Sequence, residues 1–457
     1  MDTQNKMGVK PVPGLLMSMS IPMIISMLVQ ALYNIVDSIF VAQISEEALT
    51  AVSLVFPWQN LIIAVAVGTG VGVNAMLSRW LGAGNRKLAN STALHGLILS
   101  VLSFIVVAII GTACSNLFFS VQTDVPGIIE FGDEYMNIIS ACSLGCFVAC
   151  MAEKLLTATG KTGLTMVTQA SGAITNIILD PIFIFGLFGV PRLEVAGAAI
   201  ATVIGQFVGA IVGLVLNYTR NKDINLSFKG FRWDGQVVKH IYGVGLPSII
   251  MQSIGSIMTF GMNQILISFT TTATAVFGVY FKLQSFVFMP VFGITNGVVP
   301  LAAYNYGAGK PERIMDTWKW GCIYATCFMV VGFLLFQFVP ETLLSMFNPS
   351  PDLIRIGDVA LRMISWSFLL AGFGIVTGSF FQALGHGMIS MWTSIIRQLA
   401  ALLPIAWLFS RTGNLDLVWL AFPLSEIISC VVVILFLRKV IREQIHPMYG
   451  RSEKAGA

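Results

Sequence analysis

Twelve apolar stretches separated by short polar loops constrain this chain more than any other feature. In the first half they cover residues 14–44, 48–76, 90–114, 131–158, 164–187 and 194–218. In the second half they cover residues 239–268, 273–302, 314–340, 356–384, 388–410 and 416–439. Each can supply the roughly 20 helical residues that cross a bilayer core about 30 Å thick. The pattern predicts an all-α integral membrane protein with about 12 transmembrane helices.

The composition agrees with a chain surrounded by lipid. Hydrophobic residues make up 56% of it and charged residues only 11%, whereas a soluble protein carries about 25% charged residues. The basic residues form no continuous stripe, which argues against a nucleic-acid partner. Cys142, Cys146 and Cys150 recur on one helix face, but no histidine accompanies them, so we interpret them as packing residues rather than metal ligands.

The distribution of Lys and Arg predicts the orientation of the chain. Most of the 26 basic residues fall in loops on one side of the membrane, and Arg192, Arg355 and Arg411 fall on the other. Because cytoplasmic loops carry the excess of Lys and Arg, both termini are expected in the cytoplasm. The sequence therefore predicts a multi-pass protein of the cell (inner) membrane.

The two halves of the chain resemble each other at an offset of 225 residues. Pro22 then corresponds to Pro247, and the tripeptide 82–84 (GAG) corresponds to 307–309 (GAG). Each half holds an even number of spans, so the repeats run parallel, and a cavity is expected between them. The predicted organisation is an N-terminal six-helix lobe (1–218), a cytoplasmic linker (219–238), a C-terminal six-helix lobe (239–440) and a cytoplasmic tail (441–457).

Two carboxylates, Asp37 and Asp180, lie inside apolar stretches of the first half. A charge at membrane depth costs roughly 2.5–3.5 kcal/mol, so such residues usually face a polar cavity and carry function. At a rise of about 1.5 Å per residue, both lie at the same depth as Thr202. Asn34 precedes Asp37 by one turn, and Asn176 precedes Asp180. The five residues predict a site for protons or cations; the alternative is packing between neighbouring helices.

The second half has no acid where the first half has Asp37, since the corresponding residue is Met262. Ion coupling is therefore predicted in the first lobe only. The second half has polar residues of its own, which are candidates for substrate contacts: Asn263, Lys282, Gln382, Arg397 and Glu426. Lys282 and Glu426 are expected either to face each other as a structural ion pair or to face a substrate, and the two alternatives are equally favoured. Arg362 and Arg397 could also extend towards an interface.

Pro22 lies near the start of the first span, where it would kink the helix and free a carbonyl group. The kink could be a hinge or a static bend. The sequence contains no HExxH, GxSxG or GxxxxGK[ST] motif, so an enzyme is not expected. Without an ATP-binding segment, uphill transport would have to use an ion gradient, and no cofactor is expected.

The chain resembles the MATE (multidrug and toxic compound extrusion) family. The resemblance is carried by the first-span pattern IPMIISMLVQALYNIVDSIFVAQISEEALTAVSL and by the loops SRWLGAGNRK and AAYNYGAGKPER. It covers nearly the whole chain and implies a two-lobed bundle that exports organic cations or drugs in exchange for H⁺ or Na⁺. It also implies a first-lobe site at Asp37, Asn176, Asp180 and Thr202, which could hold Na⁺. The acid pair that some members carry in the second lobe is missing, with Asn263 and Gln382 nearby.

The leading hypothesis is a monomeric secondary antiporter that exports amphipathic, cationic compounds and is coupled through the first-lobe carboxylates. The coupling ion, H⁺ or Na⁺, stays open. One alternative is a flippase for a lipid-linked precursor, which would need a cavity lined by basic side chains; only Lys282, Arg362 and Arg397 qualify. A less favoured alternative is a passive channel, which would need a polar stripe on several helices.

Overall fold

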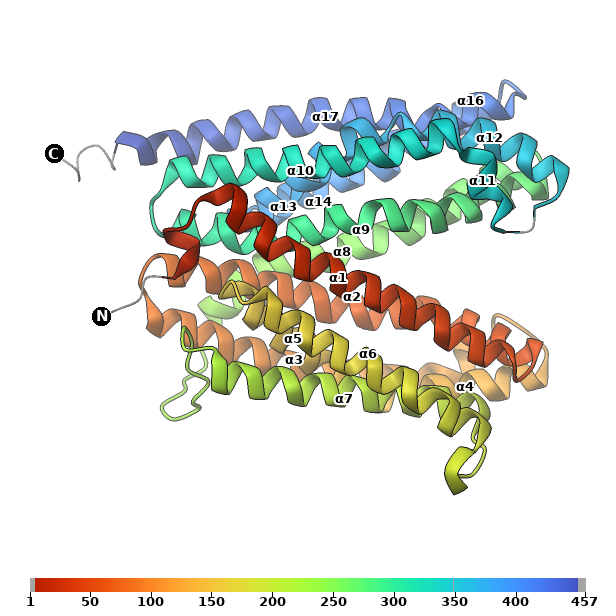
Figure 1. Ribbon diagram of the computed structural model, residues 1–457, viewed down its shortest axis with the longest axis horizontal. Coiled ribbons are helices and arrows are strands. Elements are labelled where there is room, and N and C mark those ends of the chain that lie inside the picture. Colours follow the sequence, from red (N-terminus) through yellow and green to blue (C-terminus); the bar gives the residue numbers. More distant parts are fainter. Residues whose placement is uncertain (1–4, 348, 451–457) are drawn as a thin grey trace. The chain divides into compact units, whose positions relative to one another are not determined.

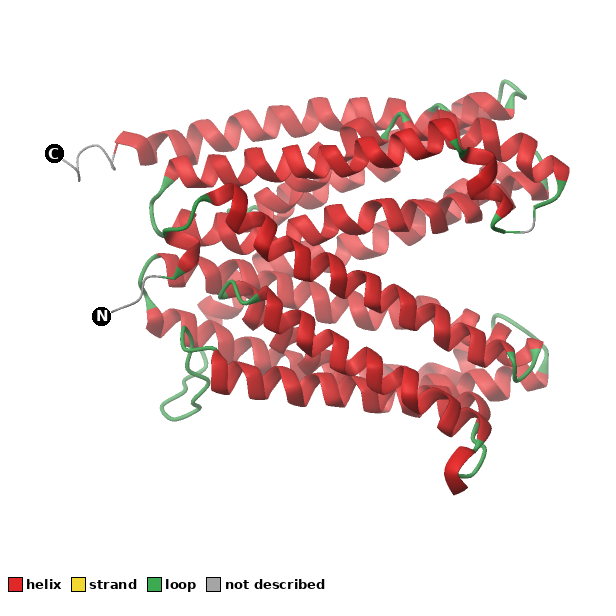
Figure 2. Cartoon of the chain, viewed as in Figure 1, coloured by secondary structure: helices red, strands yellow, loops and turns green. Residues whose placement is uncertain are grey.

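The computed structural model of this protein describes residues 5–347 and 349–450, and its regular elements there are helices (Figure 2). The first half contains α1 (Val12–Ala42), α2 (Glu46–Gly82), α3 (Arg86–Ser120), α4 (Pro126–Ala141), α5 (Leu144–Ala158), α6 (Thr162–Phe185) and α7 (Glu194–Arg220). Two 3-10 turns, η1 (Lys6–Gly8) and η2 (Leu187–Gly189), precede α1 and follow α6.

The second half begins with α8 (Gly235–Ile267), α9 (Thr271–Gly307), α10 (Pro311–Phe338) and the short α11 (Pro340–Ser345). It continues with α12 (Pro351–Ser365), α13 (Phe368–Ala383), α14 (Gly387–Ile395), α15 (Leu403–Ser410), α16 (Leu415–Trp419) and α17 (Ala421–Val440). Two π-helical segments, η3 (Ile396–Leu402) and η4 (Ile441–Ile445), follow α14 and α17.

The number of spans agrees with the prediction from hydropathy. Among the described residues, 10 helices are long and apolar enough to cross a membrane, and two bent pairs raise the number to 12. The pair α4 and α5 is bent by 48°, and the pair α12 and α13 by 51°. Each pair fills one predicted apolar stretch, and counting each pair as one span gives the predicted number. The predicted class of fold, an all-α membrane bundle, is confirmed.

The helices group into two compact units whose boundaries differ from the predicted linker. One unit comprises residues 25–81 and 85–249, and the other comprises residues 1–24, 82–84 and 250–457. The chain therefore passes from one unit to the other inside α1 and inside α8. Both crossings lie two residues after a proline, Pro22 in α1 and Pro247 in α8.

Close helix packing explains why the first parts of α1 and α8 leave their own halves. In the first unit, α8 packs on α2 at Gly72, where an added Cβ would collide with the carbonyl oxygen of Ile241. In the second unit, α1 packs on α9 at Gly297, where an added Cβ would lie 2.9 Å from the Oγ of Ser20. Glycines at such contacts let helix backbones approach closely. Hydropathy alone does not predict that the first parts of α1 and α8 pack in the unit of the other half of the chain.

The loop that joins α9 to α10, together with the first turn of α10, binds the segment preceding α1. The Nζ of Lys310 donates to the carbonyl of Gly8 (2.7 Å), and Arg313 donates from Nη2 to the carbonyls of Met7 and Lys10 (2.8 Å each). The loop turns at Gly309, whose φ of +69° suits glycine. The basic residues of the repeated loop motif therefore bind backbone oxygens here.

Candidate functional site

The polar site in the unit of residues 25–81 and 85–249 depends on the close approach of α6 and α7, which lie side by side (Figure 1). A Cβ added to Gly172 of α6 would lie 2.9 Å from the carbonyl oxygen of Gly205, and one added to Gly205 of α7 would lie 2.7 Å from that of Gly172. Because neither residue has a side chain, the two backbones meet, which brings Asn176 to Thr202.

Asn176 connects the polar groups of these two helices. Its Nδ2 donates to the Oδ1 of Asp180 at 3.3 Å and to the Oγ1 of Thr202 at 3.2 Å. Asp180 is fully buried, and Asn176 and Thr202 are 3% and 9% exposed. Asn176, one turn before Asp180, therefore links the two residues of these helices that were predicted to lie at one depth, Asp180 and Thr202.

Asp37 of α1 completes this cluster. Its half-buried side chain is a direct neighbour of the Asp180 carboxyl group. Within the part of the chain that the structure describes, Asp37 Oδ1, Asn176 Oδ1 and Asp180 Oδ2 are buried without a hydrogen-bond donor. Unsatisfied buried acceptors are costly, and two adjacent carboxylates repel each other when both are ionised. The arrangement is therefore suited to take up a proton or a cation that prefers oxygen ligands.

Two tyrosines border the acid pair, and sequence reasoning missed both. Tyr33 and Tyr135 lie close enough to Asp37 and Asp180 to interact with them electrostatically. Tyr135 of α4 is almost fully buried, and its Oη accepts a hydrogen bond from Gln59 Nε2 of α2 at 2.9 Å. The spacing of Tyr33, four residues before Asp37, was a usable signal because it places both on one helix face.

Two aromatic rings lie beyond the acid pair, towards the end of the helices that carry it. Phe40 of α1 and Phe185 of α6 make an edge contact, with ring centroids 6.1 Å apart. Phe40 follows Asp37 by one turn, and Phe185 follows Asp180 by somewhat more than one. The ring contact therefore joins α1 to α6 about one turn beyond the carboxylates.

Asn34 does not join the cluster. Its side chain is exposed, in contrast to the half-buried Asp37 and Tyr33 of the same helix. It lies three residues from Asp37, about 60° around the helix, which is enough to put it on an outer face.

The charged residues of the second half pair differently from the prediction. Glu426 of α17 is 6% exposed, and its Oε1 lies 3.8 Å from Nη1 of Arg397 in η3. Lys282 of α9 is exposed, and its Nζ lies 5.8 Å from the centroid of the Phe347 ring. The proposed pairing of Lys282 with Glu426 is therefore wrong, because Arg397 occupies the position next to the carboxylate.

The remaining candidates of the second half are scattered. Gln382 of α13 is 9% exposed, and its Nε2 donates to the Oγ of Ser390 at 3.2 Å. Asn263 of α8 is half-buried. Arg362 does not extend alone towards an interface, since its Nε pairs with Asp358 on the same helix at 3.0 Å. These residues form no cluster comparable to that around Asp180.

A second acidic position in the first half escaped the sequence analysis. Glu153 of α5 is half-buried, and its Oε2 accepts a hydrogen bond from Gln169 Nε2 of α6 at 2.8 Å. The side chain of the neighbouring Lys154 lies over Gly70 of α2, where an added Cβ would be 2.7 Å from its Cγ. The usable signal was an acid inside the predicted apolar stretch 131–158.

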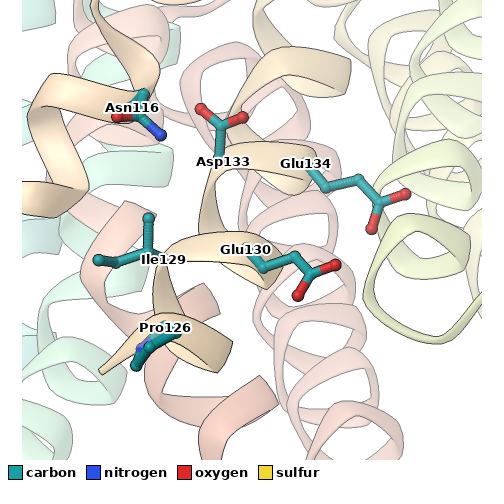
Figure 3. Close-up of a pocket in the computed structure, with 6 residues that line it drawn as sticks. All are labelled: Asn116, Pro126, Ile129, Glu130, Asp133 and Glu134. Atoms are coloured by element: carbon teal, nitrogen blue, oxygen red, sulfur yellow. The ribbon is translucent and has the colours of Figure 1, made fainter. Parts of the chain in front are cut away.

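A pocket of about 560 Å³ lies between the end of α3 and the start of α4 (Figure 3). Its lining residues are Asn116, Pro126, Ile129, Glu130, Asp133 and Glu134. The carboxylates of Glu130 and Glu134 extend to the same side of α4 (Figure 3). The pocket does not include the acid pair, and no group of metal-binding side chains was found among the described residues.

Comparisons with known proteins agree over nearly the whole chain. The MatE family profile matches residues 22–182 and 247–408, two matches that begin 225 residues apart. The probable multidrug resistance protein NorM of Thermotoga maritima is 26% identical over 427 residues, covering 92% of this chain and 91% of the relative. An FAD transporter of Shewanella oneidensis is 25% identical over 425 residues, covering 92% of each chain.

One solved structure shows the same fold over almost the entire length. It is an outward-facing multidrug resistance MATE family transporter of the MOP superfamily, with a TM-score of 0.91 and 26% identity. The match covers 98% of this chain and 99% of that one. The apolar helices, the family profile and the similar transporters define a multi-pass membrane transporter rather than an enzyme. The chain belongs to the MATE family.

Proposed function

We propose that this protein is a secondary antiporter that exports amphipathic, cationic drugs or metabolites in exchange for H⁺ or Na⁺. Coupling takes place at Asp37 and Asp180, assisted by Asn176 and Thr202. The observation that carries the proposal is the set of buried oxygens without donors around the acid pair. An arrangement that leaves acceptors unsatisfied favours binding of a proton or a cation.

The coupling follows from linked conformational equilibria. An ion bound between Asp37 and Asp180 relieves the repulsion of the two carboxylates. It therefore stabilises the conformation in which the carboxylates are close together. Substrate binding favours the shape in which the acids have released the ion. Exchange of ion for substrate then needs no direct contact between them, because each binds the two conformations with different affinity.

Pro22 and the orientation of the chain belong to the same proposal. Pro22 removes the N–H that would bond to the carbonyl of Ser18, which makes α1 bendable just before the chain passes between units. A change at the acid pair could therefore alter the bend of α1. Both termini face the cytoplasm in this scheme, so the acid pair lies in the outer half of the membrane.

The contacts of the basic residues support export of cations over the flippase alternative. Of the three basic candidates, Arg397 is paired with Glu426 and Arg362 with Asp358, which leaves Lys282 alone to meet a pyrophosphate. The name of the Shewanella relative, an FAD transporter, points to an anionic cargo for that protein. A cationic dye and a flavin nucleotide are therefore the two substrates to compare.

The decisive experiment uses purified protein in sealed liposomes. Accumulation of a fluorescent organic cation and of FAD is measured under an imposed pH gradient, an imposed Na⁺ gradient and no gradient. The proposal expects gradient-driven movement of the cation against its own concentration. Transport of FAD alone, or dissipation of ion gradients without any counter-substrate, would refute it.

The Asp37→Asn and Asp180→Asn variants separate the coupling site from the rest of the mechanism. Each should lose uphill transport under both gradients while keeping the thermal unfolding temperature within a few degrees of the wild type. Glu130→Gln is the matched control, because it removes an acid of the same unit outside the cluster. Full uphill transport by both site variants would show that coupling lies elsewhere.

A further inference from the structure

The segment between α7 and α8, residues 221–234, is held firmly against its own unit. Lys161 donates from Nζ to Asn221 Oδ1 at 2.9 Å and forms an ion pair with Asp223. The amide N–H of Asn225 donates to Asn90 Oδ1 at 2.8 Å. Ile224 packs into the hydrophobic core beside it. The segment is therefore an ordered part of the unit rather than a flexible linker.

The far end of the segment is anchored on His95 of α3. The amide N–H of Asp234 donates to His95 Nε2 at 2.9 Å. The rings of Phe231 and Trp233 lie against the imidazole, with centroids 4.9 Å and 5.1 Å away. These contacts hold residues 228–233, here named the tip, against α3.

The tip presents basic and aromatic side chains outward. It contains a turn in which the N–H of Phe231 donates to the carbonyl of Phe228 at 3.0 Å, with Gly230 at φ +81°. Phe228 is 56% exposed and Trp233 is 53% exposed, and Lys229 and Arg232 between them are exposed too. Asp223, in contrast, is used in the ion pair with Lys161. The outward side of the tip is therefore positive as well as apolar.

The tip continues a stripe of exposed residues on α7. Ile211, Val215 and Tyr218 are 60%, 53% and 85% exposed and recur at spacings of four and three residues, which puts them on one helix face. Along the chain, the exposed residues are aliphatic in α7, aromatic at Tyr218 and basic in the tip. The same order runs from the hydrocarbon core of a bilayer through its interface to the headgroups. In Figure 1 the connecting loop extends past the end of α7.

We propose that the tip is a docking surface for anionic phospholipid headgroups. Lys229 and Arg232 bind the phosphates, while Phe228 and Trp233 enter the interfacial layer. A membrane partner is favoured over a soluble acidic protein because the exposed apolar stripe lies on α7, a helix long and apolar enough to cross a membrane, and the tip follows it closely in the chain. Since the segment that carries the tip is bound to His95, Asn90 and Lys161, bound lipid supports the packing of α3, α6 and α7 at this end of the unit.

The expected strength follows from the charge of the tip. A basic side chain near an anionic membrane surface contributes about 1 kcal/mol, or about fivefold in affinity. Removing both Lys229 and Arg232 should therefore weaken the preference for anionic lipid by about 30-fold at low salt. The effect should shrink as salt screens the charges.

The test uses the full-length protein in mixed micelles of detergent and lipid. Its thermal unfolding temperature is measured during titration with phosphatidylglycerol and, separately, with phosphatidylcholine. The wild type should gain stability at a much lower fraction of phosphatidylglycerol. Lys229→Gln/Arg232→Gln should shift this titration midpoint more than tenfold towards higher lipid. Inorganic phosphate at the same concentration should have no effect, which separates a headgroup in a membrane-like phase from the free anion.

Two control variants make the result specific. Lys229→Arg/Arg232→Lys keeps the charges and should titrate like the wild type. Lys87→Gln/Lys439→Gln removes two exposed basic residues outside the tip and should also keep the wild-type midpoint. A wild-type midpoint in Lys229→Gln/Arg232→Gln, or an equal response of the wild type to both lipids, would overturn the proposal.

Discussion

Asn176 and Thr202 lie 3.2 Å apart, from the Nδ2 of one to the Oγ1 of the other, and this bond joins α6 to α7 at the acid pair. It exists because the glycines at 172 and 205 let the two helices touch. The ion site and the packing of these helices are therefore parts of one structure. Perturbing either should affect the other.

The Thr202→Val variant tests the hydroxyl group directly. It keeps the shape of the side chain but removes the acceptor of Asn176, which should lower the free energy of unfolding by about 1 kcal/mol. If the hydroxyl also ligates Na⁺, the Na⁺ concentration for half-maximal transport should rise at least fivefold. Thr202→Ser should stay close to the wild type in both measurements. Unchanged stability and ion dependence in Thr202→Val would show that the bond is incidental.

Substitution of Gly205 should uncouple the two helices. A Cβ there would lie 2.7 Å from the carbonyl oxygen of Gly172, so Gly205→Ala must push α7 away from α6. We expect a loss of about 1–3 kcal/mol in stability, typical of overpacking, together with weaker ion coupling. Gly209→Ala is the matched control, one turn along the same helix, where the nearest atom would be 3.5 Å away. Equal thermal unfolding temperatures for the two variants would contradict this account.

The Arg397–Glu426 pair should respond to single and double substitutions in opposite ways. Removing one partner of a buried pair leaves an uncompensated charge and typically costs 3–5 kcal/mol, somewhat less here because the Arg397 side chain is 24% exposed. Arg397→Met and Glu426→Leu should each unfold at a clearly lower temperature than the wild type. The double variant should recover most of the loss, since no charge remains buried. Additive losses in the double variant would mean that the two residues do not act as a pair.

Loss of the Glu153 carboxylate should affect the bond to α6 without abolishing coupling at the acid pair. Glu153→Gln replaces a charge-assisted hydrogen bond to Gln169 by a neutral one and should change stability by about 1 kcal/mol. Uphill transport driven by the preferred ion should persist, in contrast to Asp180→Asn. Liposome transport and thermal unfolding of both variants, compared side by side, provide the check. Complete loss of ion-driven transport in Glu153→Gln would make this acid part of the coupling machinery.

The sequence alone determined the class of fold, the number of spans and the internal repeat, because hydropathy and periodicity are local properties of the chain. It also placed Asp37, Asp180 and Thr202 at one depth, since the rise of a helix is constant. The depth of a residue along its helix does not specify which way its side chain points or which residue it contacts, and the tertiary structure decided both. Asn34 is exposed, and Glu426 pairs with Arg397 instead of Lys282. The first parts of α1 and α8 each belong to the compact unit of the other half of the chain. These outcomes depend on which helix faces touch, and that is set by close packing between residues far apart in the chain.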